Sequence, residues 1–100
     1  MFKIMNISKD DVSEFRRVYR DVLLTSCLEI IKYLESKKER FATMTDIAEA
    51  TGYSLRTIVE RVKLLEKHGI VSTRKTAIKS KVYNVVRLEV NGIVILFAEQ

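Results

Sequence analysis

Residues 45–68 contain a short helix-like segment, a glycine turn and a longer helix-like segment, in that order. Thr45 is expected to cap the short helix, which ends at the turn around Gly52. Ser54 is expected to cap the longer helix. Gly69 should end that helix, because glycine readily adopts the left-handed conformation found just after a helix. The spacing therefore predicts a helix-turn-helix, in which one helix is fixed against its neighbours and presents its other face outward.

The residues that follow are strand-like and strongly basic. Residues 70–74 and 81–88 are rich in β-branched side chains, and residues 75–80 are expected to form the tip between them. From Ser72 to Leu88 there are five basic residues and no acidic one. A basic hairpin after a helix-turn-helix is the layout of a winged helix-turn-helix, with residues 70–88 as the wing.

The two ends of the chain are apolar and extend this unit. Residues 8–38 have helical spacing without glycine or proline, and they form either one long helix or two. Phe2–Ile7 is a short strand or arm. Asn91-Gly92 is a strong two-residue hairpin signal and should join the wing to a C-terminal strand at residues 93–97. We expect that apolar strand to be covered by the first helix or by a partner chain.

The predicted fold class is therefore α+β: a three-helix core, a β-hairpin wing and a further C-terminal strand. One hundred residues are enough for a single domain, residues 1–100. The formal net charge of +5 favours a polyanionic partner without identifying one.

Composition also argues against several classes of protein. One cysteine, Cys27, allows no intrachain disulfide, and with one histidine it makes no metal site within one chain. We see no nucleophile with its base and no phosphate loop, so we expect no enzyme activity and no cofactor. The chain lacks an apolar run of the length that spans a bilayer, and it has no signal-peptide pattern. We therefore expect an intracellular, cytoplasmic protein without a membrane partner.

The helix at residues 54–68 divides into two faces. Five apolar residues are expected to pack inward: Leu55, Ile58, Val59, Val62 and Leu65. The early residues of the opposite side approach a DNA base most closely in a recognition helix. The candidate reading set is Ser54, Arg56, Thr57, Glu60 and Arg61.

These residue types suit base recognition in the major groove. Arginine makes bidentate contacts with guanine, threonine meets a thymine methyl group, and glutamate accepts a hydrogen bond from cytosine. The basic residues of the wing would contact phosphates or enter the minor groove; they are Arg74, Lys75, Lys79 and Lys81. The alternatives are a solvated helix face and a hairpin whose lysines prevent edge-to-edge pairing.

The stretch D-I-A-E-A-T-G-Y-S-L-R-T-I-V-E-R-V-K-L-L-E-K-H-G-I-V-S-T-R resembles the winged helix-turn-helix regulators of bacteria and archaea. It is similar to the MarR-like and ArsR-like groups and to small winged-helix proteins of archaea and their viruses. Ile47-Ala48 matches the second helix of that family, and residues 62–71 match the end of its third helix. The resemblance implies a third helix in the major groove and a wing on the backbone or minor groove. The cysteine pair of ArsR-like metal sensors is absent.

The sequence thus predicts sequence-directed binding of double-stranded DNA by a transcriptional regulator. We expect a homodimer formed through the first helix and the C-terminal strand, because both ends have surplus apolar surface. The alternative function is a protein–protein interaction module in a transcription or replication assembly. Glu60 on the presumed reading face keeps that alternative open.

Overall fold

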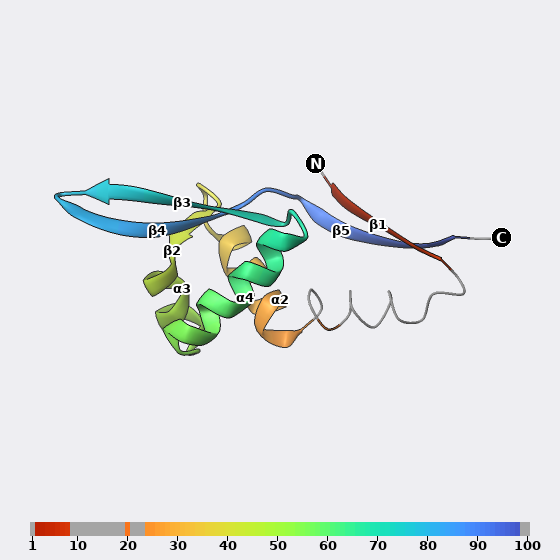
Figure 1. Cartoon of the computed structure of the whole chain (residues 1–100), viewed down its shortest axis with the longest axis horizontal. Coiled ribbons are helices and arrows are strands. Elements are labelled where there is room, and N and C mark those ends of the chain that lie inside the picture. Colours follow the sequence, from red (N-terminus) through yellow and green to blue (C-terminus); the bar gives the residue numbers. More distant parts are fainter. Residues whose placement is uncertain (1, 9–19, 21–23, 99–100) are drawn as a thin grey trace.

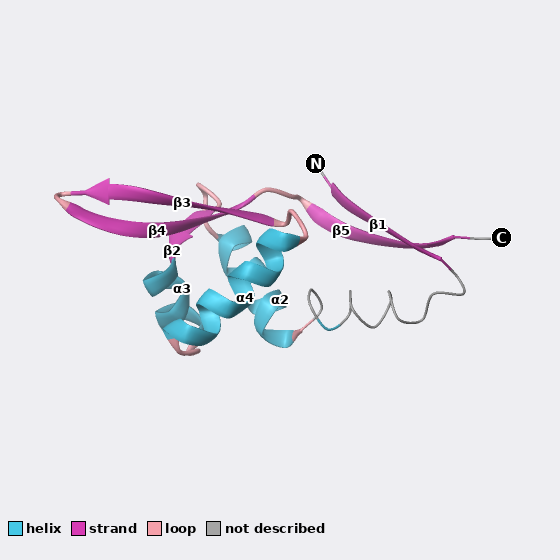
Figure 2. Ribbon diagram, viewed as in Figure 1, coloured by secondary structure: helices cyan, strands magenta, loops and turns pink. Residues whose placement is uncertain are grey.

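Three helices cover one face of a small antiparallel sheet in the computed structural model, which describes residues 2–8, 20 and 24–98 (Figures 1 and 2). The sheet has the strand order β2-β4-β3, and its long β3–β4 hairpin projects beyond the helices. This is the predicted α+β winged-helix architecture. The elements are β1 (Phe2–Ser8), α2 (Thr25–Ser36), β2 (Phe41–Thr43), α3 (Met44–Thr51), α4 (Leu55–Lys67), β3 (Val71–Ile78), β4 (Lys81–Leu88) and β5 (Gly92–Ala98).

The core lies between the helices and the inner face of the sheet. In α2 the buried residues follow helical spacing, since Cys27, Ile30 and Leu34 are three and four positions apart and are fully buried. The other helices, the turn after α4 and the sheet complete the core with Ile47, Ile58, Val62, Leu65, Ile70 and Val86, all without exposed surface. Each helix therefore contributes one apolar stripe to a shared interior.

The helix-turn-helix has a different first cap from the one predicted. Thr43, not Thr45, caps α3, and its side chain accepts a hydrogen bond from the backbone nitrogen of Asp46 at 3.1 Å. The cap moves because β2 runs directly into the helix, and Thr43 has the extended backbone that a cap position requires (φ −73°, ψ 156°). The end of α3 agrees with the prediction, because Gly52 is left-handed (φ 81°).

The second strand of the wing has the predicted bounds, whereas the first strand is longer and the tip is tighter than predicted. Both strands continue until Ile78 pairs with Lys81, so the tip is a two-residue turn at Lys79 and Ser80. Both turn residues have positive φ angles, 50° and 69°. Such angles match the twist of a hairpin, although glycine and asparagine usually supply them. The sequence lacks that signal, so spacing alone predicts a tip of six residues.

The predicted hairpin at Asn91-Gly92 is wrong. β4 already has β2 on one edge and β3 on the other, so β5 cannot pair with it. Instead β5 pairs in parallel with β1, from Phe2 opposite Gly92 to Ser8 opposite Ala98. A Cβ atom at position 92 would lie 3.0 Å from the Phe2 ring, so this glycine permits close approach of the ring.

The structure describes the C-terminal half of the predicted first helix. α2 begins at Thr25, after Leu24 in an extended conformation (φ −58°, ψ 141°). Arg20 is helical, so helix does not continue unbroken from Arg20 into α2. Residues 9–19 and 21–23 lie outside the described residues. The prediction that this part of the first helix covers β5 therefore also lies outside them.

Candidate nucleic-acid interface

The first turn of α4 is a capped and solvent-exposed helix end. The Ser54 side chain accepts a hydrogen bond from the backbone nitrogen of Thr57 at 3.1 Å and lies 3.0 Å from its hydroxyl oxygen. Ser54 thus caps α4 as predicted, and both hydroxyls remain at the surface. The N-terminus of a helix carries a partial positive charge, which favours an approaching phosphate.

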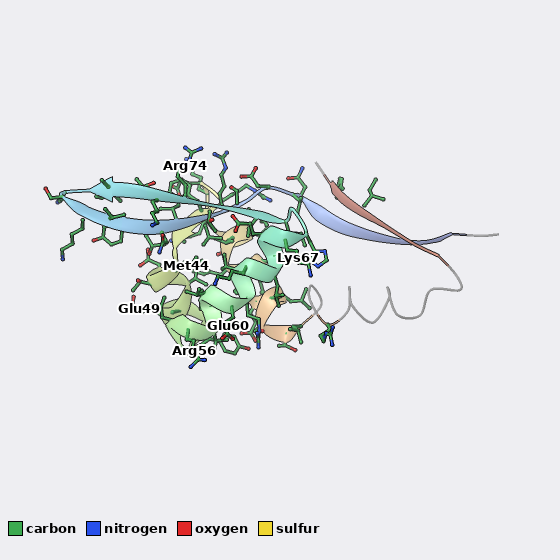
Figure 3. All side chains as sticks on the ribbon, in the orientation of Figure 1. Met44, Glu49, Arg56, Glu60, Lys67 and Arg74 are labelled. Carbon is green, nitrogen blue, oxygen red and sulfur yellow. The ribbon has the colours of Figure 1, made fainter. Side chains whose placement is uncertain are left out.

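Arg56 and Glu60 lie one turn apart on the outer face of α4 (Figure 3). The Arg56 side chain is 90% exposed, and its Nε atom is 3.5 Å from the Glu60 carboxylate. An exposed pair of this type contributes little to stability. The pair therefore leaves the guanidinium able to exchange a carboxylate for a base edge or a phosphate.

Arg61 differs from the rest of the predicted reading set. Its side chain is 30% exposed, and its Nε atom donates a hydrogen bond to the Ser26 hydroxyl of α2 at 2.8 Å. Its Nη1 atom is also 3.9 Å from Glu60. Arg61 thus connects α4 to α2, and its hydrogen bond is made to another part of the protein rather than left available at the surface.

Tyr53 packs at the same junction, partly buried against the core. Desolvation raises the pKa of its hydroxyl, and so do the charge and hydrogen bond of Glu29 on α2; Arg61 has the opposite effect. The hydroxyl thus remains neutral and donates to Glu29, which explains Tyr53 as a structural residue of the turn.

Glu66 connects the end of α4 to the root of the wing. Its carboxylate accepts two hydrogen bonds from Thr73 of β3, from the backbone nitrogen at 3.2 Å and from the hydroxyl at 2.7 Å. A charged acceptor makes such bonds stronger than neutral ones. Together with Arg61, this contact fixes α4 relative to both α2 and the wing. Sequence reasoning missed it, because spacing along one helix cannot reveal a partner on a strand.

The basic wing residues do not form one surface. In an antiparallel sheet, paired residues share a face, and successive residues alternate between faces. Arg74 pairs with Val85 and Lys81 pairs with Ile78, on the outer face of the sheet. Lys75 is on the other face, the one that carries the buried Val71 and Val86.

Figure 3 shows the consequence for the predicted site. Arg74 points away from the helices, whereas Arg56 and Glu60 lie on the opposite side of the molecule. Lys79 is at the turn of the wing, which projects past α3 and α4 (Figure 1). The arrangement thus separates Arg74 from Arg56 and Glu60 of the predicted site.

Leu55 is a second departure from the predicted helix faces. It is 49% exposed, although its spacing places it with Ile58 and Val62. Periodicity identifies a face, but burial also requires an opposing element, and the first turn of α4 is only half covered. Leu55 therefore adds apolar surface beside Arg56, of the kind that contacts a thymine methyl group.

Over the described part of the chain, no group of three histidine, cysteine, aspartate or glutamate side chains is placed to hold a metal ion. Helices long and apolar enough to cross a membrane are also absent from these residues.

Comparisons with known proteins agree with this geometry. Residues 28–72 match the family model described as winged helix-turn-helix DNA-binding. The structure is similar to the homodimeric winged helix-turn-helix DNA-binding domain of a possible ArsR-family transcriptional regulator from Mycobacterium bovis. That pair has 20% identity and a TM-score of 0.58, over 80% of this chain and 70% of the other.

A possible transcriptional regulator from Methanosarcina mazei is also similar. It has 12% identity and a TM-score of 0.60, over 78% of this chain and 67% of the other. No curated protein matches the sequence significantly. At these identities the two structures support the fold.

Proposed function

We propose that this winged helix-turn-helix protein binds double-stranded DNA in a sequence-directed way and regulates transcription as a homodimer. One observation carries the proposal: the first turn of α4 is capped, exposed and basic, and the core and the wing root hold it rigidly. A reading element has to be both accessible and fixed in position. The match of residues 28–72 to a DNA-binding family supports the same function.

In this proposal, α4 enters the major groove with its N-terminal end nearest the bases. Arg56 reads a guanine edge, and Glu60 accepts from a cytosine amino group once their mutual ion pair opens. Ser54 and Thr57 lie at the positive end of the helix and contact a phosphate. Each good bidentate base contact discriminates by about 1–3 kcal/mol.

The distal wing contacts the adjacent backbone or minor groove. Lys79 at the turn is the leading contact, with Lys75 and Lys81 on the two faces beside it. Phosphate contacts of this type position the protein without reading sequence. Arg61 supports α4 from inside, and Arg74 faces away, so the proposed DNA surface leaves both out.

The dimer part of the proposal depends on β1 and β5. Within the described residues they form a two-stranded sheet, so each strand has one edge without a neighbour. Phe2 and Ile4 on β1 are 58% and 55% exposed. A two-stranded sheet is marginal in water, and parallel strands are normally covered on both faces. A second copy would supply that cover, with the first helix alongside it.

Two-fold pairing of such ends is self-complementary, because a strand edge meets its own copy in antiparallel orientation. The dimer would present two α4 helices to half-sites about 34 Å apart, one turn of duplex DNA. The similar domain from Mycobacterium bovis is homodimeric, which supports this assembly. A regulator of this type acts inside the cell.

The test is a salt titration of binding to random duplex DNA, followed by fluorescence anisotropy. Phosphate contacts predict that log affinity falls linearly with log salt, by about 0.9 for each phosphate neutralised. The Arg56→Gln variant should weaken binding to a selected site by about tenfold. The matched control is Arg87→Gln, an exposed arginine on the opposite side of the sheet.

Equal loss from both arginine variants would contradict the assignment of the reading face. Absence of duplex binding at low salt would overturn the DNA-binding proposal. The protein–protein interaction module would then be the better explanation of the fold.

A further inference from the structure

The outer face of the sheet contains a hollow that the proposed DNA surface does not use. Its volume is about 290 Å³, and side chains from β2, β3 and β4 line it. Strand register explains how they meet: Phe41 pairs with Arg87 of β4, which in turn pairs with Ser72 of β3, and Arg74 pairs with Val85 in the adjacent row. All these side chains share the face turned away from the helices.

The hollow combines an apolar surface with positive charge. Phe41, Val85 and Ile78 provide an aromatic ring and two branched aliphatic side chains, and the first and last of these are nearly half exposed. Arg74 and Arg87 are diagonal neighbours across β3 and β4 and lie on the same face. Pockets for small ligands have this composition, mostly apolar with a few polar groups that set orientation.

The charges at the rim do not cancel. Glu89 is the acidic residue among the lining side chains, and it accepts a hydrogen bond from the Ser72 hydroxyl at 2.6 Å. Its distance to the Arg87 Nε atom is 4.0 Å, too long for a hydrogen bond. The two guanidinium groups of Arg74 and Arg87 thus outnumber the single carboxylate of Glu89, and that carboxylate already accepts a hydrogen bond from Ser72.

We propose that this hollow binds a small amphipathic anion, a compact aromatic or aliphatic body that carries one acidic group. The body would rest on Phe41 and Val85, which lie in adjacent rows of the sheet, and the acidic group would meet Arg74 and Arg87. A guanidinium suits this role because its planar donors match the oxygens of a carboxylate or sulfonate. The volume, near the lower end for ligand pockets, fits one or two fused rings.

This site is independent of the proposed function. It lies on the other side of the sheet from Arg56 and Glu60 (Figure 3), and its binding is measured without DNA. Failure of either proposal therefore leaves the other intact.

The experiment uses two fluorescent probes that share a body and differ in charge. 1-Anilinonaphthalene-8-sulfonate is an aromatic anion, and N-phenyl-1-naphthylamine is the same body without the sulfonate. We expect the anion to bind the full-length protein more tightly than the neutral probe. The double variant Arg74→Gln/Arg87→Gln should weaken anion binding by about tenfold and leave neutral-probe binding unchanged.

Two controls keep the result specific. Arg56→Gln removes an exposed arginine on α4 and should leave the binding of both probes unaffected. Amide chemical shifts should move at Ser72, Thr76 and Val85 when the anion binds. A circular dichroism melt confirms that the double variant is folded.

The proposal is overturned if anion binding survives in the double variant, or if Arg56→Gln weakens it equally. It is also overturned if the shifts cluster on β1 and β5, because that two-stranded sheet would then be the binding surface. If neither probe binds, the proposal is also overturned, and this face becomes a better candidate for contact with a protein.

Discussion

The helix-and-sheet unit of residues 24–90 and the β1–β5 ribbon meet the same requirement, burial of apolar side chains, in different ways. Within the unit, residues such as Ile30, Ile58 and Leu65 are fully buried by three helices and three strands. In the ribbon, Phe2 and Ile4 remain more than half exposed. Figure 1 shows the ribbon extending away from the helices.

Among the described residues, one part of the chain closes its own core, whereas the other leaves large apolar side chains exposed. Burial of a large aliphatic side chain stabilises the fold by about 1.5–3 kcal/mol, and an exposed one contributes little. The unit therefore has the means to fold by itself and to hold α4 in place. The ribbon acquires the same stabilisation when another surface covers it, and in our proposal that surface is a second copy.

Truncation in the two regions gives the largest contrast. Ile58→Ala should lower the free energy of unfolding by about 2–5 kcal/mol, because it leaves a cavity among fully buried neighbours. Ile4→Ala should cost less than about 1.5 kcal/mol at low protein concentration, since the side chain is already half in water. Urea unfolding followed by circular dichroism measures both. Equal losses would mean that the ribbon belongs to the same closed core.

Introducing a charge on β1 tests the proposal that a second copy of the chain covers the β1–β5 ribbon. Ile4→Lys should weaken self-association by several kcal/mol, because it places like charges together in a two-fold interface. Light scattering should then report a monomer at concentrations where the natural sequence is dimeric.

Val82→Lys is the matched control for that experiment, since Val82 is an exposed valine on the wing. It should leave the dimer intact. A monomeric natural protein at every concentration would refute the dimer, and dissociation by both variants would place the interface elsewhere.

Two glutamates on α4 allow a sharper comparison inside the closed unit. Glu66→Ala should cost about 1–3 kcal/mol, because two donors of Thr73 lose a charged acceptor. Glu60→Ala should change stability by less than about 0.5 kcal/mol, because its ion pairs are largely exposed. Thermal denaturation distinguishes the two. Equal effects would show that the link between α4 and the wing contributes no more than a surface ion pair.

The wing tip should give the smallest effect, and the opposite sign. Ser80 has a φ angle of 69°, which glycine adopts without strain. Ser80→Gly should therefore stabilise the protein by up to about 1 kcal/mol. Thr76→Gly within β3 should destabilise it, because glycine weakens the interior of a strand. A lower melting temperature for Ser80→Gly would contradict the observed turn.

Local signals predicted the helix-turn-helix well. Ser54 caps α4, and Gly52 and Gly69 are left-handed at the ends of the two helices. These features depend on a few neighbouring residues, so they can be read from spacing. The prediction failed at Thr45, because the strand before α3 moved the cap to Thr43.

Pairing between distant segments was harder to predict. Asn91-Gly92 has a strong hairpin sequence, yet both edges of β4 were already occupied. Likewise, composition grouped Arg74 with Lys75 and Lys79, whereas alternation along β3 places Arg74 on the outer face. Which edge or face a residue occupies depends on strands that lie far away in the sequence.

The order of elements, the capped helix and the basic wing follow from local sequence, because capping, turns and periodicity are local interactions. Tertiary packing is what places Arg61 against α2, Glu66 at the wing root and Arg74 away from α4. It also decided that β1 joins β5 rather than leaving β5 to pair with β4. These outcomes depend on packing and strand order, which arise when the whole chain competes for a limited number of edges and buried positions.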